Sequence, residues 1–165
     1  MLNPIDTAAV IRDGGAIGKY PDQIHPGVAW WLGACLVVNE KASHLAVAHD
    51  GHRVSSIFAQ RLGQGAINAE HYACRVSDLG THPEMELLEV ARSIGGPAAW
   101  LSTQTGNGLL VQVRLYTGAG VLLDDSNGLA AIRERIDQDR VPIPVNYQAK
   151  GTIAPWHPAS AGGRP

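Results

Sequence analysis

Short apolar segments alternate along this chain with longer segments whose apolar residues recur every three or four positions. The apolar run at 44–49, for example, is followed by Phe58, Leu62 and Ile67 at helical spacing. Strands that alternate with helices are typical of layered α/β domains. The sequence therefore predicts a mixed sheet flanked by helices, with parallel pairing through the crossovers and an antiparallel hairpin at one edge.

Residues typical of the ends of helices and strands predict where the individual helices and strands lie. Helices are expected at 25–36, from Ser55 or Ser56 to 67, from an N-cap at Thr81 to 94, and at 128–136. Strands are expected at 44–49, 70–76, 97–102 and 109–116, with a turn at 117–120 that leads into 121–123. Glu84, Glu86 and Glu89 are interpreted as the solvated face of a helix.

Length and charge narrow the class of protein. With 165 residues, the chain is expected to form one domain over residues 1–150, followed by a flexible tail rich in proline and glycine at 151–165. A net charge of −2 without a basic run argues against nucleic-acid binding. No segment has the signature of a signal peptide or a membrane span, so a cytoplasmic location is expected.

Cysteines and histidines are the candidate metal ligands. Cys35 and Cys74 lie in apolar segments without metal spacing, which favours reduced structural thiols over a disulfide. The histidines around Asp50 suggest a metal, but the odd separation of His44 and His49 in a strand places them on opposite faces. No metal site is therefore predicted. The adjacent Trp30 and Trp31 are interpreted as core packing, with a partner surface as the alternative.

Ligands of α/β sheets gather at the loops that follow the carboxyl ends of strands. The sequence offers three such loops, at 50–56, 77–81 and 103–108. The last reads Thr-Gln-Thr-Gly-Asn-Gly. Its hydroxyl and amide side chains, beside glycine, fit either a backbone nest for an anion or a plain polar turn.

Four segments in order carry a resemblance to a known family: residues 18–26, 47–56, 103–108 and 128–132. They resemble the first domain of the α-D-phosphohexomutases, the phosphomannomutase and phosphoglucomutase family. The likeness extends over about residues 10–140, and no single motif in it is specific. It implies the α/β fold that the alternation of elements also predicts.

Members of this family carry a serine loop of the form Thr-Ala-Ser-His-Asn-Pro, whose phosphoserine donates and reclaims a phosphoryl group. In the matching stretch Thr103 and Asn107 keep the family residues, while Thr105 replaces the phosphoserine. The β-methyl group of a threonine restricts its rotamers and crowds an in-line attack. An arginine of an earlier family loop is replaced by Ile17, which offers no fork for a phosphate.

Three cations lie near family phosphate-binding positions. Lys19 flanks the missing arginine, Arg53 belongs to a stretch similar to the family's Asp-x-Arg-x-Ser-Ser, and Arg114 lies near the position of a lysine. The resemblance implies that these residues, with Thr103 and Asn107, bind a phosphate or substrate. It assigns the catalytic position to Thr105.

The family's later domains, which coordinate magnesium, read the sugar and bind its phosphate, are not in this sequence. The expectation is therefore a phosphohexomutase-like domain, non-catalytic by itself, that binds a sugar phosphate or a protein partner such as a full-length mutase. The alternative is one subunit of a split phosphohexomutase, an intramolecular phosphotransferase only with domains from another chain. No cofactor is expected for the chain alone, and Mg²⁺ only if a second domain completes it.

Overall fold

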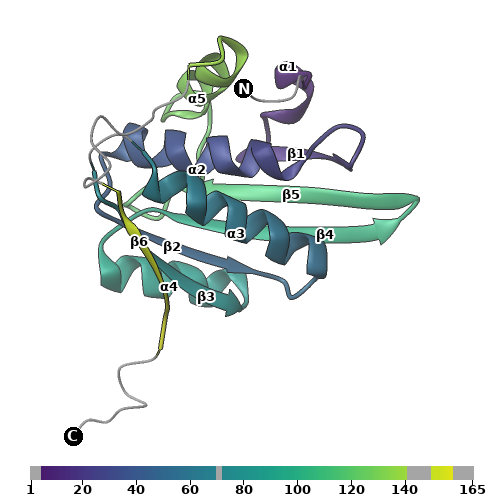
Figure 1. Cartoon of the computed structure of the whole chain (residues 1–165). Coiled ribbons are helices and arrows are strands. Elements are labelled where there is room, and N and C mark those ends of the chain that lie inside the picture. Colours follow the sequence, from purple (N-terminus) through teal and green to yellow (C-terminus); the bar gives the residue numbers. More distant parts are fainter. Residues whose placement is uncertain (1–4, 70–71, 141–149, 158–165) are drawn as a thin grey trace, which may run out of the picture.

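The computed structural model of the chain describes residues 5–69, 72–140 and 150–157 and shows one mixed sheet with helices on both faces (Figure 1). The strands follow the order β1-β5-β4-β2-β3-β6. The strands are β1 Gly15–Tyr20, β2 His44–His49, β3 Arg75–Thr81, β4 Ala98–Gly106, β5 Gly108–Tyr116 and β6 Thr152–Pro155. The helices are α1 Thr7–Val10, α2 Pro26–Glu40, α3 Arg53–Ile67, α4 Glu84–Ile94 and α5 Leu129–Asp137.

The pairing confirms the predicted α/β class. Strands β2, β3, β4 and β6 pair in parallel, whereas β5 pairs antiparallel with both β4 and β1. The carboxyl ends of β2 and β4 therefore lie at the same edge of the sheet, next to the start of α3. That edge is where an α/β sheet places its ligands.

Helices α2 and α3 pack against each other over one face of the sheet, and α4 packs on the other face against β2 and β4. The main core lies on the first face and includes Phe58, Leu32 and Leu101, all fully buried. Glycines let the two helices approach closely. A Cβ atom at Gly33 would lie 2.0 Å from the carbonyl oxygen of Leu62, which is too close for any side chain.

Helix boundaries follow local chemistry, with two corrections. The N-cap of α3 is His52, whose Nδ1 accepts a hydrogen bond from the N–H of Val54, rather than Ser55 or Ser56. Both serines lie inside the helix. The N-cap of α4 is Pro83 rather than Thr81. The expected end of α4 is confirmed by Gly95, whose left-handed backbone closes the helix.

Two strands differ from the sequence prediction. The strand expected at 70–76 lies at Arg75–Thr81, and residues 70–71 fall outside the described residues. The glycine-bearing stretch from Gly15 to Gly18, expected as a loop, is part of edge strand β1. Its pairing with β5 is a long-range interaction that local composition does not reveal.

The polar segment expected to be a loop is a β-hairpin. Strands β4 and β5 remain paired up to Gly106 and Gly108, so that only Asn107 lies between them. The hairpin tip, residues 103–108, projects beyond the end of β2, at the right-hand side of Figure 1, while β1 pairs with β5 as far as Leu109. A positive φ of 93° at Gly108 makes this tight turn.

The C-terminal boundary predicted at residue 150 needs correction. Residues Thr152–Pro155 form β6, which pairs with β3 and extends the sheet. The chain is held on both sides of this strand, since the N–H of Gly151 donates to Ile67 and that of Trp156 to Asp78. The rest of the expected tail, from 158 on, lies outside the described residues.

Candidate functional site

A hydrogen-bonded cluster joins the carboxyl ends of β2 and β4 to the first turn of α3. Asp50 follows β2, and its Oδ2 accepts a hydrogen bond of 2.8 Å from the N–H of Thr103. The Thr103 hydroxyl lies 2.6 Å from the hydroxyl of Ser55, which is fully buried. Three segments far apart in the sequence are thereby held at one point.

The pKa of Asp50 reflects this environment. Burial alone would raise it, but hydrogen bonds donated by the N–H groups of Thr103 and His52 and by the Ser55 hydroxyl outweigh burial and lower the pKa. The carboxylate is therefore charged at neutral pH, with both oxygens already accepting hydrogen bonds.

The first turn of α3 offers groups that attract an anion. Within the described part of the chain, the backbone N–H groups of Arg53 and Ser55 have no acceptor, and the Arg53 guanidinium forms no ion pair. Arg53 is exposed and is the first residue of the helix. Unsatisfied N–H groups at a helix N-terminus, together with its dipole, favour negative ligands.

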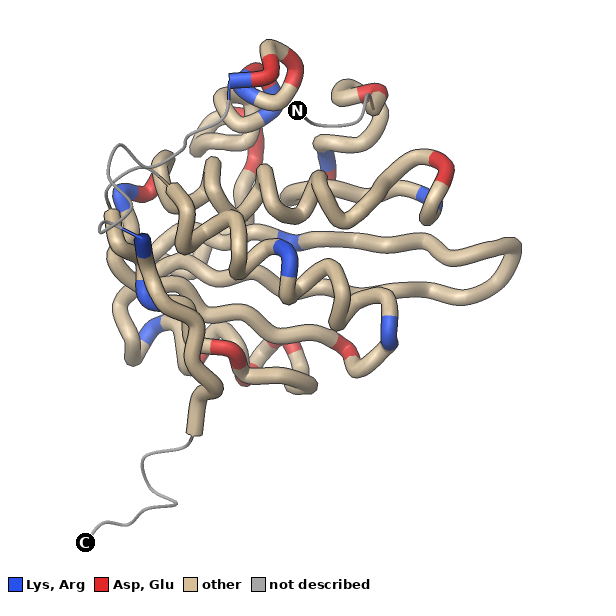
Figure 2. The backbone as a smooth tube through the Cα atoms, viewed as in Figure 1, with Lys and Arg blue, Asp and Glu red and all other residues tan. Residues whose placement is uncertain are grey.

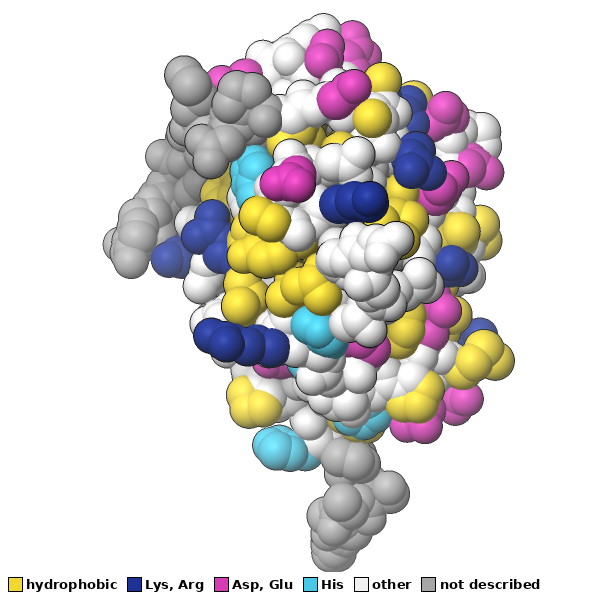
Figure 3. All heavy atoms as spheres, turned by 90° about the vertical axis from the view of Figure 1, so that its right-hand side faces the viewer, with side chains coloured by type: hydrophobic (Ala, Val, Ile, Leu, Met, Phe, Trp, Pro, Cys, Tyr) yellow, Lys and Arg dark blue, Asp and Glu magenta, His cyan; other side chains and the backbone are white. Residues whose placement is uncertain are grey.

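Thr105 and Asn107 lie at the hairpin tip and are exposed. Together with Lys19 they line a shallow depression of about 230 Å³. Figure 2 shows no charged residue on β4 and β5 around the tip, and Figure 3, which faces this end, shows uncharged white side chains there. The side-chain hydroxyl of Thr105 makes no hydrogen bond among the described residues.

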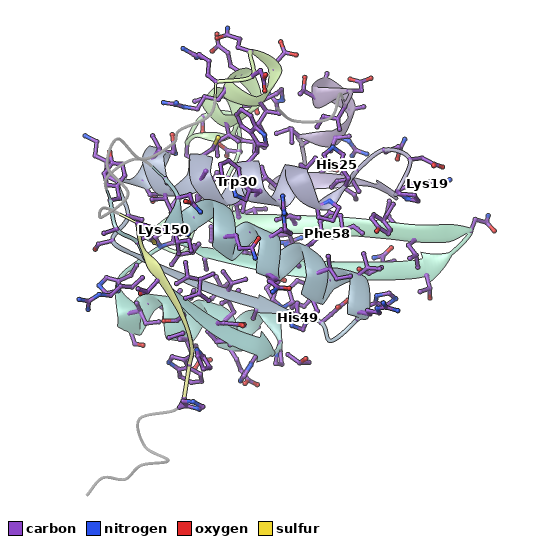
Figure 4. The ribbon with its side chains drawn as sticks, in the orientation of Figure 1. Lys19, His25, Trp30, His49, Phe58 and Lys150 are labelled. Carbon is purple, nitrogen blue, oxygen red and sulfur yellow. The ribbon has the colours of Figure 1, made fainter. Side chains whose placement is uncertain are left out.

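The strand register divides the predicted phosphate ligands between the two faces of the sheet. Thr105 pairs with Leu109, whereas Lys19 pairs with Leu110, and consecutive residues of a strand point to opposite faces. Figure 4 shows Lys19 near the carboxyl end of β1, well separated from His49 at the carboxyl end of β2. Lys19 and Thr105 therefore do not direct their side chains to a common point.

The Arg114 side chain contacts Glu84 and Tyr116 and is not part of the carboxyl-edge cluster. Its Nε lies 2.7 Å from Glu84 and 3.3 Å from the hydroxyl of Tyr116, which in turn donates to Glu84. The hydrogen bond to Tyr116 and the charge of Glu84 raise the pKa of Arg114. The interpretation of Glu84 as part of a solvated face is wrong, because this carboxylate joins α4 to the sheet.

The remaining candidates are placed as follows. Both Cys35 and Cys74 are buried and free. Trp31 is buried, whereas Trp30 is half-buried and packs against the core.

Among the described residues no group of three or more histidine, cysteine, aspartate or glutamate side chains is arranged to hold a metal ion. None of the described helices combines the length and apolarity needed to cross a bilayer.

The sequence patterns miss the partnership of Asp50 and Ser55 with Thr103. They place Asp50 and Ser55 in the 50–56 loop and in the family-like stretch at 47–56, but they do not connect either residue with Thr103. The available signal is positional, because both residues follow β2 and Thr103 follows the buried part of β4. Two parallel strands that are neighbours in the sheet bring such residues together.

These features define the chain as an α/β domain of the mixed-sheet type with a polar cluster at the carboxyl edge. Its structural neighbours are phosphoglucomutase/phosphomannomutase family proteins. One, from Burkholderia thailandensis, superposes with a TM-score of 0.74 at 16% identity over 96% of this chain. A protein from Thermus thermophilus assigned as a phosphomannomutase superposes with a TM-score of 0.68 at 17% identity over 98% of this chain.

The chain spans about a third of these neighbours, since the match covers 35% of each of them. At such identities the likeness establishes the fold alone. No protein-family model and no curated protein matches the sequence.

Proposed function

We propose that the chain is a phosphohexomutase-like domain that binds a sugar phosphate at the start of α3 and performs no mutase turnover by itself. One observation carries the proposal: the cluster of Asp50, Ser55 and Thr103 fixes the carboxyl end of β4 against a helix start with free N–H groups. The phosphohexomutase-like fold supports the substrate class. The exposed Thr105, whose hydroxyl makes no hydrogen bond to a base among the described residues, supports the absence of turnover.

Arg53 is the charged residue expected to contribute most to phosphate binding. A guanidinium binds phosphate oxygens through charge-assisted hydrogen bonds, and Arg53 adjoins the free N–H groups. Asp50 opposes an anion through its charge. Its two oxygens are held by Thr103 and His52, however, so the carboxylate serves to position the two segments.

Titration of the ¹⁵N-labelled chain with glucose 6-phosphate tests the proposal. We expect saturable shifts of the backbone amides from Arg53 to Ser55 and of Thr103, and affinity at least fivefold weaker in Arg53→Gln. Arg61→Gln is the matched control, because Arg61 is exposed on the same helix about two turns later. Equal weakening in both variants, or shifts confined to residues 104–108, would contradict the site.

A split enzyme is the second candidate. The observation that favours it is that the chain corresponds to only about a third of its structural neighbours. A partner chain with the remaining domains would supply Mg²⁺ ligands and the second phosphate site. Mutase activity that appears only when such a chain is added would support this function, and unchanged inactivity with a partner that demonstrably binds would rule it out.

A further inference from the structure

A second concave site lies beside the carboxyl-edge cluster of Asp50, Ser55 and Thr103, over β2, β3 and β6. It is a partly open cavity of about 270 Å³ between α3 and these three strands. The helix lines it with Ser56, Gln60 and Gln64, which recur every four residues on one face. The side chains of these three residues make no hydrogen bond within the described chain.

The sheet supplies an aliphatic wall. Val47 on β2, Val76 on β3 and Ile153 on β6 line the cavity beneath the polar row. Gly63 keeps the space open, because a Cβ atom there would lie 3.2 Å from the Ile153 side chain. Strand β6, which the sequence did not predict, therefore forms part of the site.

Two further groups at the strand ends have fixed hydrogen-bonding roles. Nδ1 of His49 accepts a hydrogen bond of 3.0 Å from the N–H of Gly51, so the neutral ring carries its proton on Nε2 and can only donate there. Asp78 accepts a 2.9 Å hydrogen bond from Gly80 through Oδ1, which leaves Oδ2 as an acceptor. Both residues line the cavity.

We propose that this cavity binds a small uncharged polyol. A hydroxyl group both donates and accepts, so neighbouring hydroxyls satisfy the His49 donor and the Asp78 acceptor together. An ammonium ion has no acceptor for His49. A phosphate is repelled by Asp78, the only carboxylate among the described lining residues, which include no lysine or arginine.

The volume of the cavity and the chemistry of its lining fit a small polyol. The cavity is smaller than the roughly 300–1,000 Å³ of sites for drug-sized ligands, and it holds a compact molecule. The amides of Gln60 and Gln64 each offer donors and an acceptor for further hydroxyls, while the CH groups of a polyol contact Val76 and Ile153. The inference is independent of the phosphate site, which uses Arg53, Ser55 and Thr103.

Titration of the full-length ¹⁵N-labelled chain with myo-inositol tests the proposal. We expect saturable amide shifts at Ser56, Gln60 and Gln64 with millimolar affinity, and binding at least fivefold weaker in Gln60→Leu. Gln60 is exposed on its helix, so leucine preserves helix formation. Gln104→Leu is the control, because Gln104 is exposed at the hairpin tip, outside the cavity.

Butylammonium and inorganic phosphate serve as charged probes in parallel titrations. The proposal is overturned if myo-inositol gives no saturable shift at these amides, or if either charged probe shifts them with higher affinity. It is also overturned if Gln60→Leu binds as tightly as the unmodified chain. Should that variant fail to fold, Gln60→Ala removes the same amide, and the same criterion applies.

Discussion

Asp50 connects the residues of the carboxyl-edge cluster through the hydrogen bonds of its two carboxylate oxygens. Its pKa is lower in the folded chain than in the unfolded chain, because hydrogen bonds from Thr103, His52 and Ser55 outweigh the effect of burial. The charged form therefore stabilises the fold above the unfolded pKa of about 3.9, and this contribution is lost as the pH falls through the folded pKa. Asp50→Asn removes the charge at nearly constant shape.

We expect Asp50→Asn to lower the free energy of unfolding at pH 7 by about 1 kcal/mol, a modest value because the side chain is exposed. The difference from the unmodified chain should shrink below pH 4. Urea unfolding at a series of pH values measures it. A difference that stays constant from pH 7 to pH 3 would show that the carboxylate charge is not what stabilises the cluster.

The thiols of the two cysteines should be unreactive in the folded chain. Burial raises the pKa of the Cys35 thiol to about 12 and that of Cys74 to about 12. Since the thiolate is the reactive form, neither should react with a maleimide at pH 8 while the chain is folded. Both should react in urea. Fast modification of the native chain, followed by mass spectrometry, would contradict their placement in the core.

At the scale of elements, the contact between α2 and α3 depends on glycine. A Cβ atom at Gly33 would lie 2.0 Å from the carbonyl oxygen of Leu62, so Gly33→Ala must push the helices apart. We expect a loss of about 2–3 kcal/mol in stability, measured by urea unfolding. Gly106→Ala is the control, because a Cβ atom at Gly106 meets nothing within 4 Å. Equal stability of the two variants would refute the close packing.

The hairpin tip explains why restoring the family's loop residues should fail. The combined change Thr105→Ser, Gly106→His, Gly108→Pro and Ile17→Arg reinstates the serine and the arginine. Gly108 has a φ of 93°, however, which proline cannot adopt, so the turn should unravel. Ile17 pairs with Gln112, which itself pairs with Ser102, and this places the new guanidinium on the face opposite the serine at 105.

The repaired chain is therefore expected to take up no phosphate from glucose 1,6-bisphosphate. Mass spectrometry of the incubated protein measures this. The chain with Thr105→Ser alone, which leaves the turn intact, is the control for the fold. A stable phosphoserine at 105 in the fourfold variant would show that the loop can rearrange into a phosphoryl acceptor.

The sequence located the four longer helices and strands β2 and β5, but it did not reveal β1, for a physical reason. Apolar spacing and end signals such as Gly95 are local, and α2, α4 and α5 follow them closely. Strand β1 depends on pairing with β5, about ninety residues away, and its glycine-bearing sequence resembles a loop. Backbone hydrogen bonds hold a strand regardless of side-chain polarity, so the polarity of the hairpin tip predicts a loop where the chain forms paired strands.

The candidate site was predictable only in part. Strand order placed the loops after β2 and β4 at one edge, which is where the cluster lies. The contact between Ser55 and Thr103 needed the position of α3 relative to β4, a tertiary property. Likewise, no local pattern shows that Arg114 pairs with Glu84, since the two lie on different elements.

The arrangement of cations in the folded chain determines which phosphate chemistry it can support. Phosphoryl transfer needs positive groups that converge on the transferred phosphate. Here Arg53 lies at the start of α3, whereas Lys19 lies at the carboxyl end of β1, which β5 and β4 separate from β2, and Arg114 is held by Glu84. Among the described residues, these three cations therefore do not converge on one point.

We expect the purified chain to show no conversion of glucose 1-phosphate to glucose 6-phosphate, even with Mg²⁺ and glucose 1,6-bisphosphate. Loss of the cations that neutralise a transition state typically costs several orders of magnitude in rate. A coupled dehydrogenase assay measures the product. Thr105→Ala separates contamination from true activity, because a contaminating mutase is unaffected by this change. Turnover that follows the chain through purification and disappears in Thr105→Ala would show that the exposed threonine at the hairpin tip acts as a phosphoryl acceptor without a convergent cation cluster.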